Sequence, residues 1–223
     1  MLLCIDQVLT PQELKLITEK LSNAEFVDGK TTAGWYAQQV KNNLQVKAES
    51  EPIQELNAIV FQALLRNPLF QMAVRPKVMR PVLFSKYEPG MSYGLHVDNA
   101  IMGDRSPNRS DVSLTLFLNS ASSYEGGELV IDTSIGEKAF KLEAGAMVIY
   151  PSSSLHQVKP VTKGVRFAAI TWIQSIVRSA EQRELLFDLD TVRQLLFKKH
   201  GKTPEFDILS KTHANLLRMW AEV

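Results

Sequence analysis

The chain has 223 residues, with 25 basic and 24 acidic side chains and a net charge of +1. This length suits one compact domain with elaborations, and the balanced charge leaves no electrostatic footprint for nucleic acid or an anionic membrane. The single cysteine, Cys4, excludes an internal disulfide framework and fits a reducing compartment. We expect Cys4 to be a small buried side chain.

The sequence shows no targeting or membrane segment. The apolar run at residues 1–5 is too short for a signal peptide and lacks a basic leader. No stretch approaches the ~20 apolar residues that a membrane span requires. We therefore expect a soluble protein of the cytoplasm that acts away from membranes.

Residues 1–77 are expected to form a mostly helical support region. The sequence Thr10-Pro11-Gln12-Glu13 has the spacing of a capping box with proline at the first helical position. A second helix should begin between Ser50 and Pro52, because apolar residues then recur at helical intervals. The polar segment 28–43 between the two helices is either a loop or a strand that borders the site.

Residues 78–176 change to short strands and form the expected core. Alternating or apolar runs at 112–118, 128–131 and 145–150 are separated by glycine-marked turns. Several strands at such spacing indicate a sandwich or barrel, and a jelly roll leaves a mouth for a ligand between its two sheets. The fold class is therefore α+β, with a jelly-roll core braced by the N-terminal helices.

Residues 177–223 are expected to form a helical hairpin. One helix should start after Ser179 and stop at Gly201, and the next should start at Thr203-Pro204. His213 lies on the apolar stripe of the last helix, where a packed or interface histidine is the expected role. The stripe must be buried against the core or against a second subunit, which makes the hairpin a candidate surface for homo-oligomerisation.

His96 and Asp98 form a His-x-Asp triplet that predicts a metal site. In an extended segment the two side chains point to the same face, because strand side chains alternate with period two. His156, from a distant strand, would complete two nitrogens and one oxygen, the facial triad that suits non-heme Fe(II) and leaves positions open. Oxygen and a cosubstrate can bind at those open positions.

Arg166 opens the otherwise apolar strand 165–173. A buried cation without a partner is costly, and the planar fork of arginine matches a carboxylate. A dicarboxylate cosubstrate would supply that partner. Trp172 shares a strand face with Arg166 and is either a pocket residue or a core aromatic.

Several motifs occur together around these residues. In chain order they are Tyr87-Glu88-Pro89-Gly90, Tyr93-Gly94-Leu95-His96-Val97-Asp98 and Tyr124-Glu125-Gly126-Gly127-Glu128-Leu129, followed by His156 and Arg166. The combination resembles the Fe(II)/2-oxoglutarate dioxygenases of the prolyl 4-hydroxylase type. More narrowly, it resembles the bacterial PKHD-type hydroxylases that are often associated with iron-uptake genes. The core of the resemblance spans about residues 80–175, and the flanks also resemble that subgroup.

The resemblance implies a function and roles for individual residues. The fold would be the double-stranded β-helix version of a jelly roll, and the activity the hydroxylation of an unactivated carbon, with oxygen consumed and succinate and carbon dioxide released. Fe(II) would be held by His96, Asp98 and His156, and 2-oxoglutarate by Arg166, with L-ascorbate as a further cofactor candidate. Tyr87 and Tyr93 match tyrosines that help to bind the cosubstrate.

Two other functions remain open on the sequence. The same triad could hold zinc in a hydrolase, although Arg166 in an apolar strand argues against that. A non-catalytic iron- or oxygen-sensing accessory protein could use the same pocket. The substrate, whether peptidyl proline, a free amino acid or a small siderophore-like molecule, is not fixed by the motifs. The turn-rich segment from Asn99 to Asp111 is expected to be a lid.

Overall fold

Two β-sheets form the centre of the molecule, which a computed structural model describes for residues 1–48, 52–103 and 106–223. The larger sheet contains β1 (Leu3–Ile5), β2 (Phe26–Asp28), β4 (Leu44–Val46), β5 (Pro76–Met79), β6 (Leu83–Tyr87), β10 (Val112–Phe117), β14 (Met147–Pro151) and β17 (Arg166–Ser175). The smaller sheet contains β3 (Lys41–Asn42), β7 (Ser92–His96), β12 (Leu129–Thr133), β13 (Gly136–Phe140) and β15 (His156–Val158). Two further pairs join β8 (Ile101–Met102) to β9 (Asn108–Arg109) and β11 (Tyr124–Gly126) to β16 (Val161–Gly164).

The order of the strands gives a jelly roll. The larger sheet runs β1-β14-β10-β17-β6-β4-β2, with β5 also paired to β17, and the smaller sheet runs β13-β12-β15-β7-β3. Side chains from both sheets, among them Phe117, Leu129 and Tyr150, pack together in one hydrophobic cluster between them. The expected α+β jelly-roll core is therefore confirmed.

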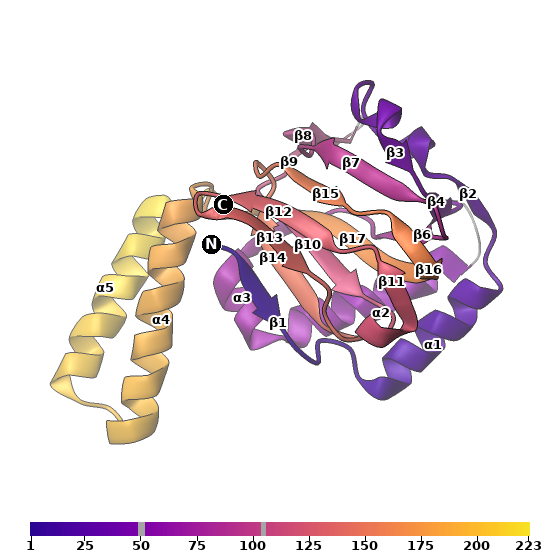
Figure 1. Cartoon of the computed structure of the whole chain (residues 1–223). Helices are drawn as coiled ribbons and strands as arrows, with labels where there is room; N and C mark the ends of the chain where they lie inside the picture. The colour runs from indigo at the N-terminus through magenta and orange to yellow at the C-terminus, as the bar shows by residue number, and fades with distance from the viewer. Residues whose placement is uncertain (49–51, 104–105) are drawn as a thin grey trace.

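Three N-terminal helices brace the larger sheet. They are α1 (Pro11–Ser22), α2 (Pro52–Arg66) and α3 (Pro68–Val74), and Figure 1 shows them along the outer side of that sheet. Their buried side chains, such as Leu56, Leu64 and Phe70, share one cluster with Leu114 of β10. Full burial of a side chain like Leu64 contributes roughly 1.5–3 kcal/mol relative to exposure. The helices therefore fix the position of the strands that carry the site.

The first helix begins as its sequence predicts. The Glu13 N–H donates to the Thr10 hydroxyl at 3.2 Å, and the Thr10 N–H donates to the Glu13 carboxylate at 2.9 Å, which completes the capping box. Helix α2 is described from Pro52 onward, and the expected start at Ser50 lies outside the described residues.

Alternation along β10 and β17 separates the helix-facing side from the inner side. Leu114 and Leu116 of β10 and Ala169 and Ile173 of β17 belong to the cluster beneath the helices. The intervening residues of β17 point inward, so that Arg166 and Trp172 share a face. Strand β10 is buried on both faces. As a result, polar side chains of these otherwise apolar strands lie in the space between the sheets.

The N-terminal region also contributes short strands to both sheets. Strands β1 to β4 lie within the first 46 residues and join both sheets, and 3-10 turns at Gly29–Thr32 and Ala37–Gln39 lie between β2 and β3. Strands of two or three residues are too short for their alternation to be seen in the sequence. Cys4, which we expected to be buried, is exposed on β1.

The C-terminal hairpin is confirmed, with α4 (Ala180–His200) and α5 (Pro204–Trp220) packed against each other. Figure 1 shows the pair extending away from the sheets. His213 is buried in the middle of α5, where His213 Nε2 lies 3.0 Å from a guanidinium nitrogen of Arg75. The histidine is therefore a packed residue that joins the hairpin to the core.

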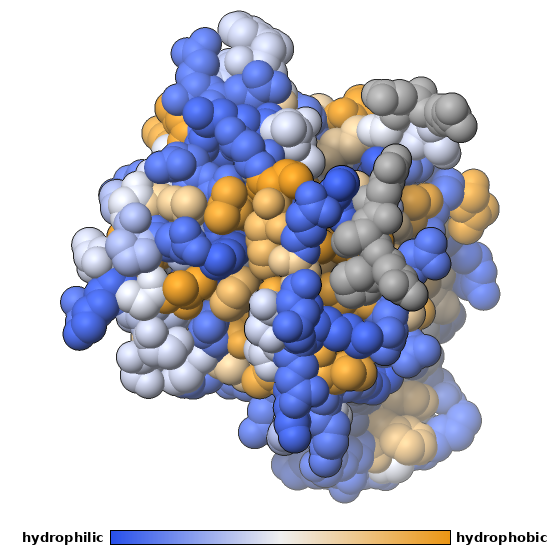
Figure 2. Space-filling model, turned by 90° about the vertical axis from the view of Figure 1, so that its right-hand side faces the viewer, coloured by the Kyte–Doolittle hydropathy of each residue, from blue (hydrophilic) through white to orange (hydrophobic). Residues whose placement is uncertain are grey.

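The surface carries both hydrophobic and hydrophilic side chains. On the face shown in Figure 2, hydrophobic side chains form a discontinuous band across the middle, with hydrophilic side chains around it. Among the described helices, none has the length and apolar character needed to cross a membrane.

Candidate active site

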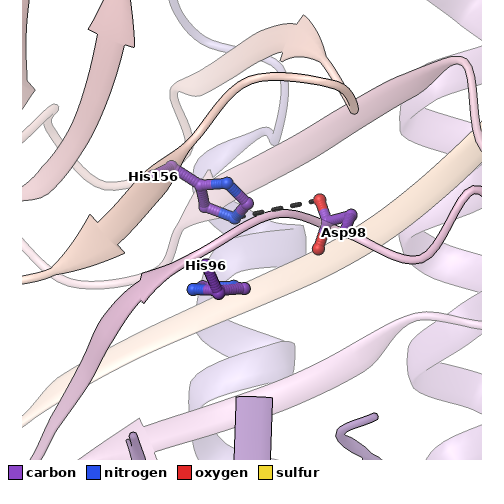
Figure 3. A group of neighbouring side chains, drawn as sticks. All are labelled: His96, Asp98 and His156. Carbon is purple, nitrogen blue, oxygen red and sulfur yellow. Dashed lines mark ion pairs between the residues drawn. The ribbon is translucent and has the colours of Figure 1, made fainter. Parts of the chain in front are cut away.

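The three predicted metal ligands lie together between the sheets. His96 ends β7 and His156 begins β15, and these two residues are directly opposite each other in the antiparallel pair. Asp98 follows His96 by two positions. One candidate ligand atom from each side chain lies within 4.8 Å of the others, and Figure 3 shows both imidazoles beside the Asp98 carboxylate. The structure thus assembles two nitrogens and one carboxylate at one point.

Both histidines are held in the same tautomer. His96 Nδ1 lies 2.8 Å from the carbonyl oxygen of Gly94, and His156 Nδ1 lies 3.0 Å from the carbonyl oxygen of Ser154. Because a carbonyl only accepts, each Nδ1 carries the proton and each Nε2 keeps its lone pair. Backbone contacts of this kind commonly orient histidine ligands around a metal.

The surroundings keep His96 neutral. Burial, followed by the neighbouring His156, lowers the pKa of His96 to about 4. The ring of Tyr93 is stacked on the His96 ring with 3.6 Å between their centres. A neutral imidazole is the form that binds a metal, so the site is ready to accept one at neutral pH.

A serine that the sequence analysis did not single out supports Asp98. Ser113 of β10 donates a hydrogen bond of 2.6 Å to Asp98 Oδ2, and Ser152 Oγ lies 2.8 Å from Ser113 Oγ. Hydrogen bonds to a ligand carboxylate fix its orientation. Alternation along β10 predicts that Ser113 points into the space between the sheets. Only the folded register shows that Ser113 lies beside the Asp98 carboxylate.

Arg166 is a buried cation without a protein carboxylate. Its side chain is 1% exposed, and its Nε has no hydrogen-bond partner among the described residues. The guanidinium carbon lies 5.1 Å from the centre of the Tyr87 ring and 5.5 Å from that of Phe117. No ion pair joins Arg166 to any carboxylate in the described parts of the chain. A buried charge of this kind calls for an anionic ligand.

The Gly126-Gly127 turn makes room for the arginine. A Cβ atom on Gly127 would lie 3.0 Å from Arg166 Cδ and 3.2 Å from Tyr124 Cε2, and the φ of Gly127 is +68°. A side chain would therefore be both strained and crowded there. This contact explains the glycine at position 127, whereas at Gly126, with φ +71°, a Cβ atom would clash with the carbonyl oxygen of Pro160.

One cavity of about 410 Å³ connects these groups. The triad, Arg166, Tyr87 and Tyr93 all line it. Burial raises the pKa of Tyr87, so its phenol stays neutral. Further lining residues that the sequence analysis did not assign to the site are Lys41, Asn43, Gln45, Arg80, Thr115, Tyr150 and Trp172. Strand alternation places Trp172 on the face of Arg166, whereas the other residues come from segments whose contacts are long-range.

Both polar segments border this cavity. Segment 28–43 contributes Thr32, Gly34 and Lys41, and the hairpin of β8 and β9 contributes Ile101 and Gly103. The expected lid from Asn99 to Asp111 therefore begins at the cavity, although residues 104–105 within it lie outside the described residues.

Comparison with known proteins identifies the family. The 2OG-Fe(II) oxygenase superfamily matches residues 82–174, and the PKHD-type hydroxylase C-terminal domain matches residues 181–222. A PKHD-type hydroxylase of Acaryochloris marina is 55% identical over 222 residues, which cover 100% of both chains. One from Rippkaea orientalis is 57% identical over 222 residues, again with 100% of each chain covered. The chain belongs to the PKHD-type hydroxylase family. It is accordingly an Fe(II)- and 2-oxoglutarate-dependent dioxygenase.

Solved structures share the fold of this PKHD-type hydroxylase. A Pseudomonas putida prolyl-4-hydroxylase has a TM-score of 0.56 at 19% identity, with 78% of this chain and 92% of that chain covered. HygX from Streptomyces hygroscopicus, with nickel, 2-oxoglutarate and hygromycin B bound, has a TM-score of 0.55 at 13% identity, with 76% and 81% covered. At these identities the likeness concerns the fold alone.

The residues of this PKHD-type hydroxylase fit the cofactors that its family implies. Two Nε2 lone pairs and a carboxylate form a donor set suited to Fe(II). The buried arginine in the same cavity suits the far carboxylate of 2-oxoglutarate. The donor set and the cation together favour an oxygenase over a zinc hydrolase.

Proposed function

We propose that His96, Asp98 and His156 bind Fe(II), that Arg166 binds 2-oxoglutarate, and that the enzyme hydroxylates an unactivated carbon of its substrate. The observation that carries this proposal is that the buried triad lies in one cavity with the buried Arg166, which has no carboxylate partner in the described parts of the chain. Neither group has a sufficient structural explanation alone. Together they match one metal and one dicarboxylate.

Each side chain has a defined task in this proposal. The Nε2 atoms of His96 and His156 and a carboxylate oxygen of Asp98 would hold Fe(II). Arg166 fixes one end of the cosubstrate, so that its other end is presented to the metal. When bound, Fe(II) and 2-oxoglutarate activate oxygen for hydroxylation, with succinate and carbon dioxide as the other products.

Tyr87 and Tyr93 have different positions beside these groups. Tyr87 is opposite Arg166 in the β6–β17 register and packs against the guanidinium. This contact supports the proposal that Tyr87 helps to hold the cosubstrate. Tyr93 stacks on His96, which supports a role in orienting that ligand and in lining the cosubstrate pocket.

The substrate class must be found by experiment, since proteins of this fold act on different molecules. One solved neighbour from Trichoplax adhaerens is a prolyl hydroxylase in complex with a peptide fragment of hypoxia inducible factor, whereas HygX was solved with hygromycin B. Segments 28–43 and 99–111 border the cavity, and we propose that they select the substrate, with segment 99–111 as its lid.

Other features remain proposals about the whole protein. The sole cysteine supports a cytoplasmic location, and the resemblance supports a link to iron uptake and L-ascorbate as a reductant. We also propose three units along the chain, residues 1–77, 78–176 and 177–223. Exposed apolar side chains on the hairpin, including Leu195, Phe197 and Ile208, support a homo-oligomer, which light scattering would test.

The test of the metal site is Fe(II) binding by alanine variants under anaerobic conditions. His96→Ala and His156→Ala should each lose stoichiometric Fe(II), because each removes one of three ligands. His200→Ala is the control, since this histidine is exposed at the end of α4. Full iron occupancy in both triad variants would overturn the assignment. Failure of the iron-loaded parent to convert 2-oxoglutarate with any substrate would favour the sensing function instead.

A further inference from the structure

Lys41 is a second buried cation in the wall of the cavity. It lies in β3 opposite Tyr93 of β7, and it is 5% exposed. Its Nζ donates a hydrogen bond of 2.9 Å to the hydroxyl of Thr32 and lies 5.1 Å from the centre of the Tyr93 ring. Lysine is rarely buried to this degree unless its charge is paired. The burial of the Lys41 charge therefore needs an explanation.

The protein leaves most of the binding capacity of this ammonium group unused. The Thr32 hydroxyl donates its own proton to acceptors, including Gln45 Oε1 at 2.6 Å, so it can only accept from Lys41. An ammonium group has three N–H donors, and no other hydrogen bond or ion pair of Lys41 occurs among the described residues. Burial lowers the pKa of Lys41 to about 8, which still leaves it protonated at neutral pH. Two N–H groups are thus available to a ligand.

The charges around the cavity indicate what that ligand is. Its described lining has three cations, Lys41, Arg80 and Arg166, and one carboxylate, Asp98. Fe(II) and 2-oxoglutarate carry opposite charges of equal size, so their binding leaves the excess positive charge in place. Under the proposed function, the two carboxylates of the cosubstrate would be bound at the metal and at Arg166. Among the described lining residues, no anion then remains for Lys41 and Arg80 in this largely buried space.

We propose that Lys41 binds a carboxylate of the primary substrate, so that the enzyme hydroxylates an acidic molecule. This inference rests on the proposed function and names its substrate class. The Tyr93 ring contacts both the Lys41 ammonium and the His96 ring, so the acid is held next to the metal ligands. The carbon that is hydroxylated therefore lies close to the acidic group. Arg80, half-buried in the same wall, adds to the positive field that attracts the substrate.

Acetate is the probe for this site, with acetamide as its uncharged counterpart. The full chain is loaded anaerobically with Fe(II) and 2-oxoglutarate, and loading is confirmed by the visible charge-transfer band of the chelated keto acid. Acetate and acetamide are then titrated by calorimetry. The variants are Lys41→Met, which keeps the apolar stem, Lys41→Arg, which keeps the charge, and Lys30→Met, which removes an exposed lysine from the same segment.

The proposal predicts that acetate binds to the parent, to Lys30→Met and to Lys41→Arg. Binding to Lys41→Met should be roughly 10- to 100-fold weaker, the effect of losing a hydrogen bond to a charged group. The binding of acetamide should be the same in all four proteins. The charge-transfer band should form in all of them, because Lys41 is not assigned to the cosubstrate.

Three results would overturn the proposal. They are the absence of acetate binding to the parent, equal acetate binding by Lys41→Met, and loss of 2-oxoglutarate rather than acetate from Lys41→Met. The last result would assign Lys41 to the cosubstrate. Absence of the charge-transfer band in the parent would instead refute the proposed function. If acetate still bound to that sample in a Lys41-dependent way, the anion site at Lys41 would be supported independently.

Discussion

Replacement of Arg166 by methionine should separate cosubstrate binding from folding. The guanidinium is 1% exposed, and no described carboxylate pairs with it. Removing a buried cation that has no carboxylate partner among the described residues should leave the free energy of unfolding unchanged or raise it. Truncating one partner of a buried charge pair costs about 2–5 kcal/mol of binding. We therefore expect the 2-oxoglutarate dissociation constant to rise roughly 30- to 4000-fold, since 1.4 kcal/mol corresponds to about tenfold.

Calorimetry under anaerobic conditions measures this effect in Fe(II)-loaded protein, and urea unfolding measures stability in the same samples. Lys163→Met is the control, because this exposed lysine lies three positions before Arg166 and pairs with Glu125 at the surface. Fe(II) affinity should be the same in all three proteins. An Arg166→Met variant that binds 2-oxoglutarate as tightly as the parent would refute the role of the arginine.

Three further predictions concern the surroundings of the site and the hairpin. Ser113→Ala removes the hydrogen bond to the ligand carboxylate and should weaken Fe(II) binding about 10- to 100-fold in competition with a chelator; unchanged affinity would contradict the role of the serine. Gly127→Ala should lower the free energy of unfolding by more than about 1 kcal/mol and weaken 2-oxoglutarate binding through Arg166, whereas Gly136→Ala, which has positive φ but open space around it, should affect stability alone. Burial lowers the pKa of His213, so the unfolded chain takes up more protons than the folded protein as pH falls from 7 to 5. The free energy of unfolding, measured with urea, should therefore fall more steeply with decreasing pH in the parent than in His213→Gln. Parallel curves for the two proteins would exclude His213 as the cause.

The site could be predicted where its signal is local. The His96-x-Asp98 spacing predicts two ligands that converge, and Arg166 is conspicuous because it opens an otherwise apolar strand. The helix boundaries at Thr10 and Gly201 follow from capping residues and a glycine stop signal. In each case the physical rule acts over a few residues, so the sequence contains enough information to apply it.

The remaining features depend on contacts between distant segments. Lys41 lies in a strand of two residues, and it becomes a buried cation only through pairing with β7. Ser113 reaches Asp98 across 15 positions, and its neighbour Ser152 lies in the turn that follows β14. Periodicity shows which face a residue occupies but not which residue from another strand lies opposite. These contacts therefore required the three-dimensional register.

The most direct test of the central claim is an anaerobic titration of metal-free protein with Fe(II) and then with 2-oxoglutarate, followed by visible absorption. The claim predicts a charge-transfer band that saturates near one equivalent of 2-oxoglutarate in the parent. At the same cosubstrate concentration the band should be much weaker in Arg166→Met. Confirmed iron binding with no band in the parent would contradict the claim that the triad and Arg166 form one cosubstrate site.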